Sequence, residues 1–141
     1  MIRLTVKGVA VDSNDNCVLV LEDNQERALL IEVNRFDAHL LSLGSQGIKL
    51  DTPMFFDLIG EICNITGCKI TKAYISGLKG DVFEAKVEIS YDGKAIILDV
   101  RPTDAVLLAL HNNVPILMDR KLEQYLDDTP VIKDTEVYYL N

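Results

Sequence analysis

The segment from residue 82 to residue 100 constrains the fold of this chain more than any other. Two strand-like apolar runs flank Asp92-Gly93, and this dipeptide is the strongest short-range signal for a β-hairpin with a two-residue loop. A loop of that length fixes the register, so Tyr91 must face Lys94. Each step back along the first strand then matches one step forward along the second.

This register sorts the side chains of the hairpin onto two different faces. One face is apolar, with three cross-strand pairs: Ile89 with Ile96, Val87 with Leu98, and Ala85 with Val100. The other face carries two pairs of opposite charge: Lys86 with Asp99, and Glu84 with Arg101. Such pairs stabilise a sheet by about 0.2–1 kcal/mol each, and they were not used to choose the register. Their agreement therefore supports it.

Further strands are expected from the apolar pattern. Ile2 and Leu4 alternate with polar residues, the phase slips at Gly8, and it resumes at Val9, which is typical of a strand with a glycine bulge. The other strands are expected at 17–21, 27–33, 69–76 and 114–118, with a late strand through Val137, Tyr138 and Tyr139. The order of strands, two helices, strands and helices predicts an α+β fold with a mixed, mainly antiparallel sheet and about four helices packed on it. We expect one domain over residues 1–126 and a C-terminal tail over residues 127–141.

Capping residues predict where the helices begin and end. The first helix is expected between Asn34, a favourable N-cap, and Gly44. The second is expected to have Thr52 as N-cap, Pro53 at its first position and Gly67 past its end. A buried helix is expected after Pro102 because residues 105–110 are apolar on every side, and a short helix is expected at 120–126. The second helix has an apolar stripe that we expect to be buried: Phe55, Leu58, Ile62 and Ile65.

The charge balance is acidic, with 14 basic and 22 acidic residues and a net charge of −8. Nucleic-acid-binding proteins usually carry a basic face, because neutralising phosphates supplies much of their affinity. The balance therefore counts against tight, non-specific binding to nucleic acid. It does not exclude a metal-dependent hydrolase, whose carboxylates make its site acidic before the metal binds. No apolar run is long enough to cross a bilayer and the N-terminus lacks a signal-peptide pattern, so a cytoplasmic location is expected.

The three cysteines are Cys17, Cys63 and Cys68, an odd number without a CxxC pair. Free cysteines are among the most buried residues in proteins, so free and mostly buried thiols are expected. A regulatory disulfide between Cys63 and Cys68 is the alternative.

The junction from Asp99 to Asp104 is the best candidate for chemistry. A strand ends there, the chain turns at Arg101-Pro102, and a helix begins, which is a favourable place for an anion. Asp99 and Asp104 could hold Mg²⁺ or Mn²⁺, and Arg101 could bind a phosphate and stabilise charge that develops during cleavage. The alternative is structural. Pro102 suits the first helical position, Asp104 suits the helix dipole, and Asp99 and Arg101 both have cross-strand partners.

Two weaker candidates lie on the predicted helices. Asp57 could supply a further metal ligand, together with Glu61 on the same helix face, although such pairs are usually a solvated surface. His39 could act as a general base, but a lone histidine is more often a surface or core residue. No HExxH, P-loop, GxSxG, GxGxxG or zinc-knuckle pattern is present.

Three motifs in order resemble the bifunctional nuclease family, over roughly residues 6–126. The most specific is the D-x-R-P-[ST]-D-A run at 99–105, followed by an apolar helix and a VPI segment at 114–116. The strand at 29–33 leading to Asp37-Ala38 is similar to the family pattern LPIxIG…EA. Residues 53–59 are similar to RPLTHDLL. The resemblance implies a domain that acts on both RNA and DNA.

The chain departs from this family at three positions. Phe56 stands where the family usually has a histidine before Asp57, and phenylalanine can neither ligate a metal nor carry a proton. Asn34 replaces a glycine and Asp37 replaces a glutamate, which are milder changes. If the missing histidine contributes to catalysis, this protein is impaired or inactive.

Two hypotheses follow from the residues and the resemblance. In the first, the chain is a metal-assisted phosphodiesterase acting on RNA and DNA, with Asp99, Asp104 and Asp57 as metal ligands and Arg101 on the phosphate. In the second, it is a non-catalytic module that binds a protein or ligand, and the junction is structural. In either case an exposed strand edge is expected to be covered in a homodimer or other homo-oligomer.

Overall fold

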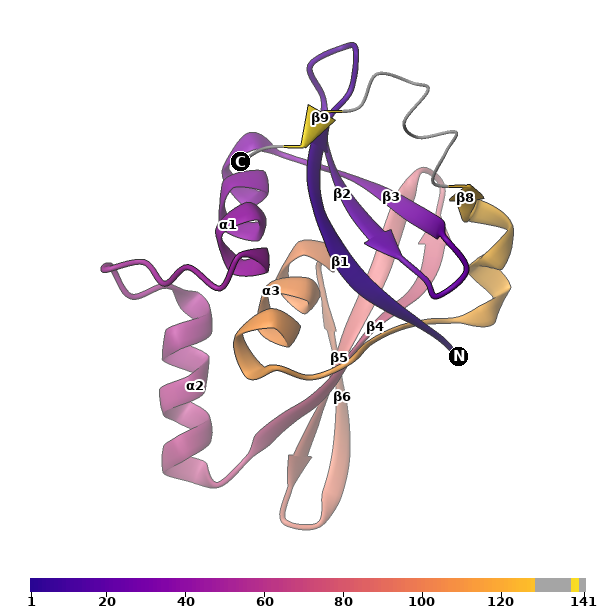
Figure 1. Ribbon diagram of the computed structural model, residues 1–141. Helices are drawn as coiled ribbons and strands as arrows, with labels where there is room; N and C mark the ends of the chain where they lie inside the picture. Colours follow the sequence, from indigo (N-terminus) through magenta and orange to yellow (C-terminus); the bar gives the residue numbers. More distant parts are fainter. Residues whose placement is uncertain (129–137, 140–141) are drawn as a thin grey trace.

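The computed structural model describes residues 1–128 and 138–139, and it contains one mixed sheet with helices packed on it (Figure 1). The strand order is β6-β5-β4-β7-β1-β2-β3-β8, and β9 pairs with β1. The strands are β1 (Ile2–Val11), β2 (Cys17–Glu22), β3 (Arg27–Val33), β4 (Lys69–Lys79), β5 (Val82–Tyr91), β6 (Lys94–Val100), β7 (Ile116–Met118), β8 (Asp127–Asp128) and β9 (Tyr138–Tyr139). Within the described chain only β4 and β7 pair in parallel. The predicted α+β class with a mainly antiparallel sheet is confirmed.

The described helices are α1 (Arg35–Ser45), α2 (Phe55–Thr66), α3 (Pro102–Asn112) and the 3₁₀ helix η1 (Arg120–Tyr125). The predicted core helix is confirmed as α3, whose residues 105–109 are all buried. It packs against β4, β5 and α1, so it lies at the centre of the molecule. None of the described helices is long and apolar enough to span a bilayer.

Strand β1 contains the predicted glycine bulge and takes part in two ladders. The register with β2 shifts between Val6 and Gly8, and Gly8 has a φ of 149° that favours glycine. Before the bulge, Ile2 pairs with Met118 of β7, and after it the strand continues along β2 as far as Val11. The bulged strand thus joins the two halves of the sheet.

The hairpin of β5 and β6 has the predicted register from Tyr91–Lys94 to Ala85–Val100. Its loop residues, Asp92 and Gly93, have φ values of 51° and 74°, as a type I′ turn requires. The predicted pair of Lys86 with Asp99 is present.

The predicted pair of Glu84 with Arg101 is wrong. The strand β6 ends at Val100, because Pro102 begins α3 and makes Arg101 the N-cap residue of that helix. The side chain of Arg101 therefore leaves the sheet and pairs with carboxylates near the helix N-termini.

Helix α1 begins directly after Asn34, the predicted N-cap residue. The backbone N–H of Asp37 donates to Oδ1 of Asn34 at 2.7 Å, which satisfies one of the unpaired donors of the first turn. The helix continues to Ser45, one residue beyond Gly44.

Helix α2 begins two residues later than predicted, at Phe55, so Thr52 is not its cap and Pro53 is not its first residue. The reason is Asp57, whose Oδ2 accepts a 2.7 Å hydrogen bond from the backbone N–H of Met54. A carboxylate at the third helical position that reaches back to the N-cap backbone is half of a capping box. It defines the helix start more strongly than the Thr-Pro pair.

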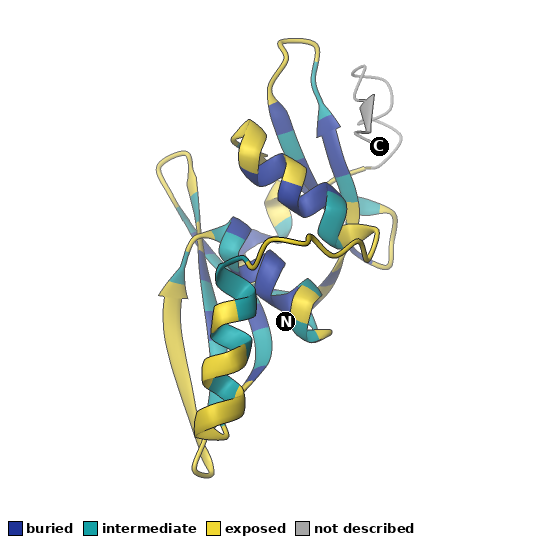
Figure 2. Cartoon of the chain, turned by 90° about the vertical axis from the view of Figure 1, so that its left-hand side faces the viewer, coloured by how far each residue is buried: buried dark blue, intermediate teal, exposed yellow. Residues whose placement is uncertain are grey.

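The prediction that the stripe on α2 is buried is wrong for three of its residues. Leu58, Ile62 and Ile65 are exposed, with Ile65 at 82%, and the outward side of α2 is yellow in Figure 2. The residues of α2 that pack against the core are instead Phe55, Phe56 and Ile59. The helix is apolar on both sides, and tertiary packing decides which side is covered.

The tail and the cysteines match their predictions in part. Tyr138 and Tyr139 form β9, which pairs with Val11 and Ala10 of β1, whereas Val137 lies outside the described residues. All three cysteines are free thiols: Cys17 is buried, and Cys63 and Cys68 are half-buried.

Candidate functional site

The Arg101 side chain ties the N-termini of two helices together. Its Nε and NH2 donate to the two carboxylate oxygens of Asp104 at 2.9 Å each, and its NH1 donates to Oδ2 of Asp37 at 3.1 Å. The bidentate bond to Asp104, and then the contact with Asp37, raise the pKa of the guanidinium above its usual value. Asp37 is buried and also accepts from Nδ2 of Asn34. We call Asp37, Arg101 and Asp104 the arginine lock, in which one guanidinium pairs with two carboxylates.

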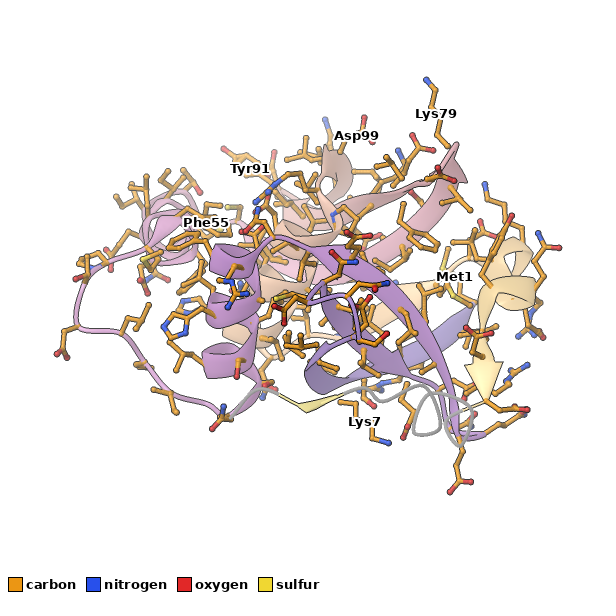
Figure 3. All side chains as sticks on the ribbon, turned by 90° about the horizontal axis from the view of Figure 1, so that it is seen from above. Met1, Lys7, Phe55, Lys79, Tyr91 and Asp99 are labelled. Atoms are coloured by element: carbon orange, nitrogen blue, oxygen red, sulfur yellow. The ribbon has the colours of Figure 1, made fainter. Side chains whose placement is uncertain are left out.

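Asp99 lies away from this lock, on the opposite face of the hairpin from Leu98 and Val100. Its side chain is 85% exposed and accepts a hydrogen bond from Lys86 Nζ, and this bond raises the pKa of Lys86. Figure 3 shows Asp99 at the rim of the molecule, well apart from Phe55 of α2.

The three carboxylates predicted as metal ligands do not form a shared site in this structure. Asp104 is bound through both oxygens by Arg101, Asp99 is bound by Lys86, and Asp57 lies on α2. Across residues 1–128 and 138–139, no three His, Cys, Asp or Glu side chains gather in a way that could hold a metal ion. As arranged here, these residues do not fit a common metal centre.

A separate cavity of about 170 Å³ opens between α1, α2, α3 and the loop that follows α1. Its apolar lining includes Leu40 and Leu43 of α1 and Leu107 and Leu110 of α3. Its charged and aromatic groups are Lys49, Phe56, Asp57 and His111. An apolar cleft with a few converging polar groups is the usual form of a binding site.

Asp57 and His111 lie side by side in the lining of this cavity. Asp57 Oδ1 is 3.8 Å from His111 Nε2, an ion-pair distance rather than a direct hydrogen bond. The ring of Phe56 lies 5.0 Å from the imidazole and holds it from one side. On α2, Gly60 leaves room beside Nε2, because a Cβ at this position would come within 3.8 Å of that nitrogen. No water fits between groups 3.8 Å apart, but both line the cavity, from which a bound substrate or water could exchange protons with either of them.

Sequence reasoning did not identify His111 as a site residue. It lies in the last turn of α3, and Asp57 lies in the first turn of α2, so no local spacing connects them. The available signal was position 56, where the resemblance places a histidine: that position lines the cavity beside His111. The other candidates, His39 and Glu61, are exposed and do not line the cavity.

Comparison with known proteins agrees with these motifs. An uncharacterized protein of Mycobacterium tuberculosis is 29% identical over 119 residues, covering 83% of this chain and 71% of that protein. Bifunctional nuclease 1 of Oryza sativa subsp. indica is 24% identical over 121 residues, and Bifunctional nuclease 2 of Oryza sativa subsp. japonica is 26% identical over 108 residues. The matches cover 84% and 74% of this chain but 36% and 33% of the rice proteins. The model of the bifunctional nuclease domain matches residues 18–127, and the chain belongs to this family.

Proposed function

We propose that this chain is a nuclease-like domain that hydrolyses phosphodiester bonds in RNA and DNA, and that the cavity holding Asp57 and His111 is its reacting site. The observation that supports this most is the position of residue 56. Within the segment that resembles the family's RPLTHDLL, Phe56 and Asp57 line the cavity, and Asp57 lies 3.8 Å from His111. Family membership and the names of the rice relatives support nucleic acid as the substrate class.

The proposed chemistry is general acid–base hydrolysis. One member of the Asp57–His111 pair takes a proton from water as the water oxygen bonds to phosphorus. The bond from phosphorus to the leaving sugar oxygen then breaks, and the other member returns a proton to that oxygen. Lys49, which lines the same cavity, would attract the phosphate as a point charge. Because water is the nucleophile, this route needs no 2′-hydroxyl and is open to both RNA and DNA.

We also propose that cleavage depends on Mg²⁺ or Mn²⁺. Mg²⁺ is commonly held by one or two carboxylates together with substrate phosphates, and Asp57 is the only one of the three predicted ligands beside the cavity. The proposed location is the cytoplasm, where three free thiols are stable.

The test is cleavage of labelled single-stranded RNA and plasmid DNA by the purified chain in Mg²⁺, Mn²⁺ or EDTA. Asp57→Asn retains an oxygen that can accept from Met54, and His111→Gln retains a polar side chain, so both variants should fold. We expect each to lose cleavage by roughly 100-fold or more. His39→Gln, an exposed histidine outside the cavity, is the matched control and should keep full activity.

Two results would overturn the assignment of this site. If Asp99→Asn or Asp104→Asn abolishes cleavage while the cavity variants remain active, the reacting site is the 99–104 junction. If the parent chain cleaves neither substrate with any metal, it is not a nuclease.

The second candidate function is the non-catalytic module that binds a protein or ligand. The observation that favours it is the arginine lock, in which the guanidinium that would bind a phosphate is already held by Asp104 and Asp37. Under this alternative the 99–104 motif orders the junction of β6 and α3 and does no chemistry. A folded parent chain that cleaves neither RNA nor DNA, and that loses stability in Arg101→Gln, would support it.

A further inference from the structure

Strand β6 is an open edge of the sheet with an apolar sequence. Among the described strands it has β5 as its one neighbour, and the consecutive residues Ile96, Ile97 and Leu98 are all exposed. A long apolar edge with unpaired backbone groups is normally protected in native proteins by charges, bulges or a covering element. The charged residues of β6, Lys94 and Asp99, lie near its two ends instead.

The exposed side of α2 extends this apolar edge. Ile96 and Leu98 share a face with Val87 of β5, which is buried in the core with α3, so both point to the side of the sheet that the helices cover. Helix α2 lies in front of that side of the sheet in Figure 2, where both α2 and β6 are largely yellow. We call the exposed apolar residues of these two elements the α2–β6 surface: Leu58, Ile62 and Ile65 of α2, and Ile96, Ile97 and Leu98 of β6. Of these, Ile97 points to the opposite face of the sheet, on the same side as Asp99.

We infer that this surface binds a second copy of the chain, with the two β6 strands paired antiparallel about a two-fold axis at Ile97. The sheets of the two copies then form one continuous sheet, and the exposed sides of the two α2 helices flank the junction. The two-fold axis makes the interface isologous, so that a single self-complementary patch covers both copies.

The backbone geometry of the hairpin selects this register. In the type I′ turn the Lys94 N–H bonds to the Tyr91 carbonyl, and bonded pairs then alternate along an antiparallel ladder. The backbone groups of residues 94, 96, 98 and 100 therefore point towards β5. Those of Ala95, Ile97 and Asp99 point to the open edge. Centring the axis on Ile97 pairs all three: Ile97 with its own copy, and Ala95 with Asp99 of the second copy.

The side chains also match in this register. Opposite residues of an antiparallel pair lie on the same face, so Ile96 meets Leu98 of the second copy on the helix-covered face. No two like charges lie opposite each other, because Lys94 meets Val100 and Asp99 meets Ala95. A chain with a net charge of −8 repels its own copy at long range, and this interface avoids adding close repulsion.

The exposed apolar area approaches that of a dimer interface. The exposed fractions of the six residues amount to about 600 Å² per copy, compared with about 800 Å² per partner in a standard interface. The paired backbone edge and the flanking residues would provide the remainder. Such a patch is at the upper limit of what monomers usually expose.

The test is the mass of the full chain in solution by light scattering after size exclusion, over a range of protein concentrations. We expect a dimer for the parent chain. Ile97→Lys should give a monomer, because it places two ammonium groups on the axis within one cross-strand spacing. Val82→Lys is the matched control: Val82 is exposed at the far end of β5 from this surface, and this variant should remain dimeric. Circular dichroism checks that each variant is folded.

A second variant keeps the inference testable if Ile97→Lys fails to fold. Opposite Cα atoms in a bonded antiparallel pair are about 5.5 Å apart, within the range that a disulfide can span. Ile97→Cys should therefore form a covalent dimer under mild oxidation, and Val82→Cys should not. A monomeric parent chain at all concentrations, an Ile97→Lys variant that is still dimeric, or equal cross-linking at both positions would overturn the inference. Capture of a different protein by a monomeric parent chain would count equally against it.

Discussion

Arg101, the N-cap residue of α3, donates through NH1 to Oδ2 of Asp37 in the first turn of α1, at 3.1 Å. The contact joins two helices whose N-termini are far apart in the sequence, and Asp37 is buried while Arg101 is largely exposed. The 99–104 motif therefore has a structural task whether or not the chain cleaves nucleic acid. The Arg101–Asp37 contact stabilises the fold mainly through the buried Asp37 carboxylate. Without the guanidinium, that carboxylate keeps Asn34 as its remaining side-chain partner.

We predict that Arg101→Gln lowers the free energy of unfolding by about 1–3 kcal/mol, the cost of leaving a buried group under-satisfied. The measurement is urea denaturation followed by circular dichroism. Asp99→Asn is the control, because Asp99 is highly exposed and its loss should change stability by less than about 0.5 kcal/mol. Equal effects of the two substitutions would contradict the arginine lock.

A substitution at Gly60 tests whether a substrate occupies the space beside His111. Replacing a glycine inside a helix with alanine stabilises the helix by up to about 1 kcal/mol, and the new Cβ would make an ordinary 3.8 Å contact with His111 Nε2. We predict that Gly60→Ala raises the melting temperature and lowers the cleavage rate, since it fills space that a substrate would use. Asn64→Ala, at an exposed position of α2 outside the cavity, should stabilise the helix without slowing cleavage. An active Gly60→Ala variant would show that the substrate does not occupy this space.

Phe56 offers a test by gain of function. The Phe56→His variant restores the residue that the family usually carries there, and it places a proton carrier in contact with the His111 ring. We predict that this variant cleaves RNA and DNA roughly tenfold faster than the parent chain, since a positioned general acid or base contributes 10²–10⁴-fold. Phe55→His, on the same turn but outside the cavity lining, is the control for a histidine placed nearby. Equal cleavage rates in the parent chain and in Phe56→His would show that the residue at position 56 does not contribute to catalysis.

The thiols of Cys63 and Cys68 should differ in reactivity. Their sulfurs are 2.9 Å apart. Burial and then the neighbouring Cys68 thiol raise the pKa of Cys63 to about 11, whereas the hydrogen bond between the two thiols lowers the pKa of Cys68. Because the thiolate is the nucleophile, we predict that iodoacetamide at pH 8 modifies Cys68 before Cys63, as measured by peptide mass mapping. In Cys63→Ala the pKa of Cys68 should rise and its labelling should slow; simultaneous labelling of both thiols in the parent chain would contradict this.

The local features of the fold were predictable from the sequence, and the packing of α2 was not. Asp92-Gly93 determines the register of β5 and β6 within a few residues, and Asn34 caps α1 through a partner three positions away. Helix α2 instead has apolar residues on both sides, so its periodicity could not distinguish the inward Phe56 and Ile59 from the outward Ile62. Contact with the rest of the core makes that choice.

The candidate site was predictable only in part for the same reason. Asp57, Arg101 and Asp104 were all identified, but each was assigned a partner from the local pattern. If the strand register is extended to Arg101, it predicts Glu84 as the partner of this residue. Pro102 instead ends the strand, and the guanidinium turns towards Asp37. Likewise, the pairing of Asp57 with His111 depends on how α2 packs on α3, which no motif in the chain encodes.

The double role of β1 has a consequence for the order in which the molecule assembles. Its second part pairs with β2, a near neighbour in sequence, but its first part pairs with β7, where Ile2 meets Met118. Contacts of such long sequence separation slow folding, because a large loop must close before they contribute stability. On the ribosome, the hairpin of β1 and β2 can form early, yet Ile2 and Leu4 have no strand beside them until β7 has been synthesised. The first residues of β1 are thus made early and paired late, and until then they are an unpaired apolar segment of the kind that promotes aggregation.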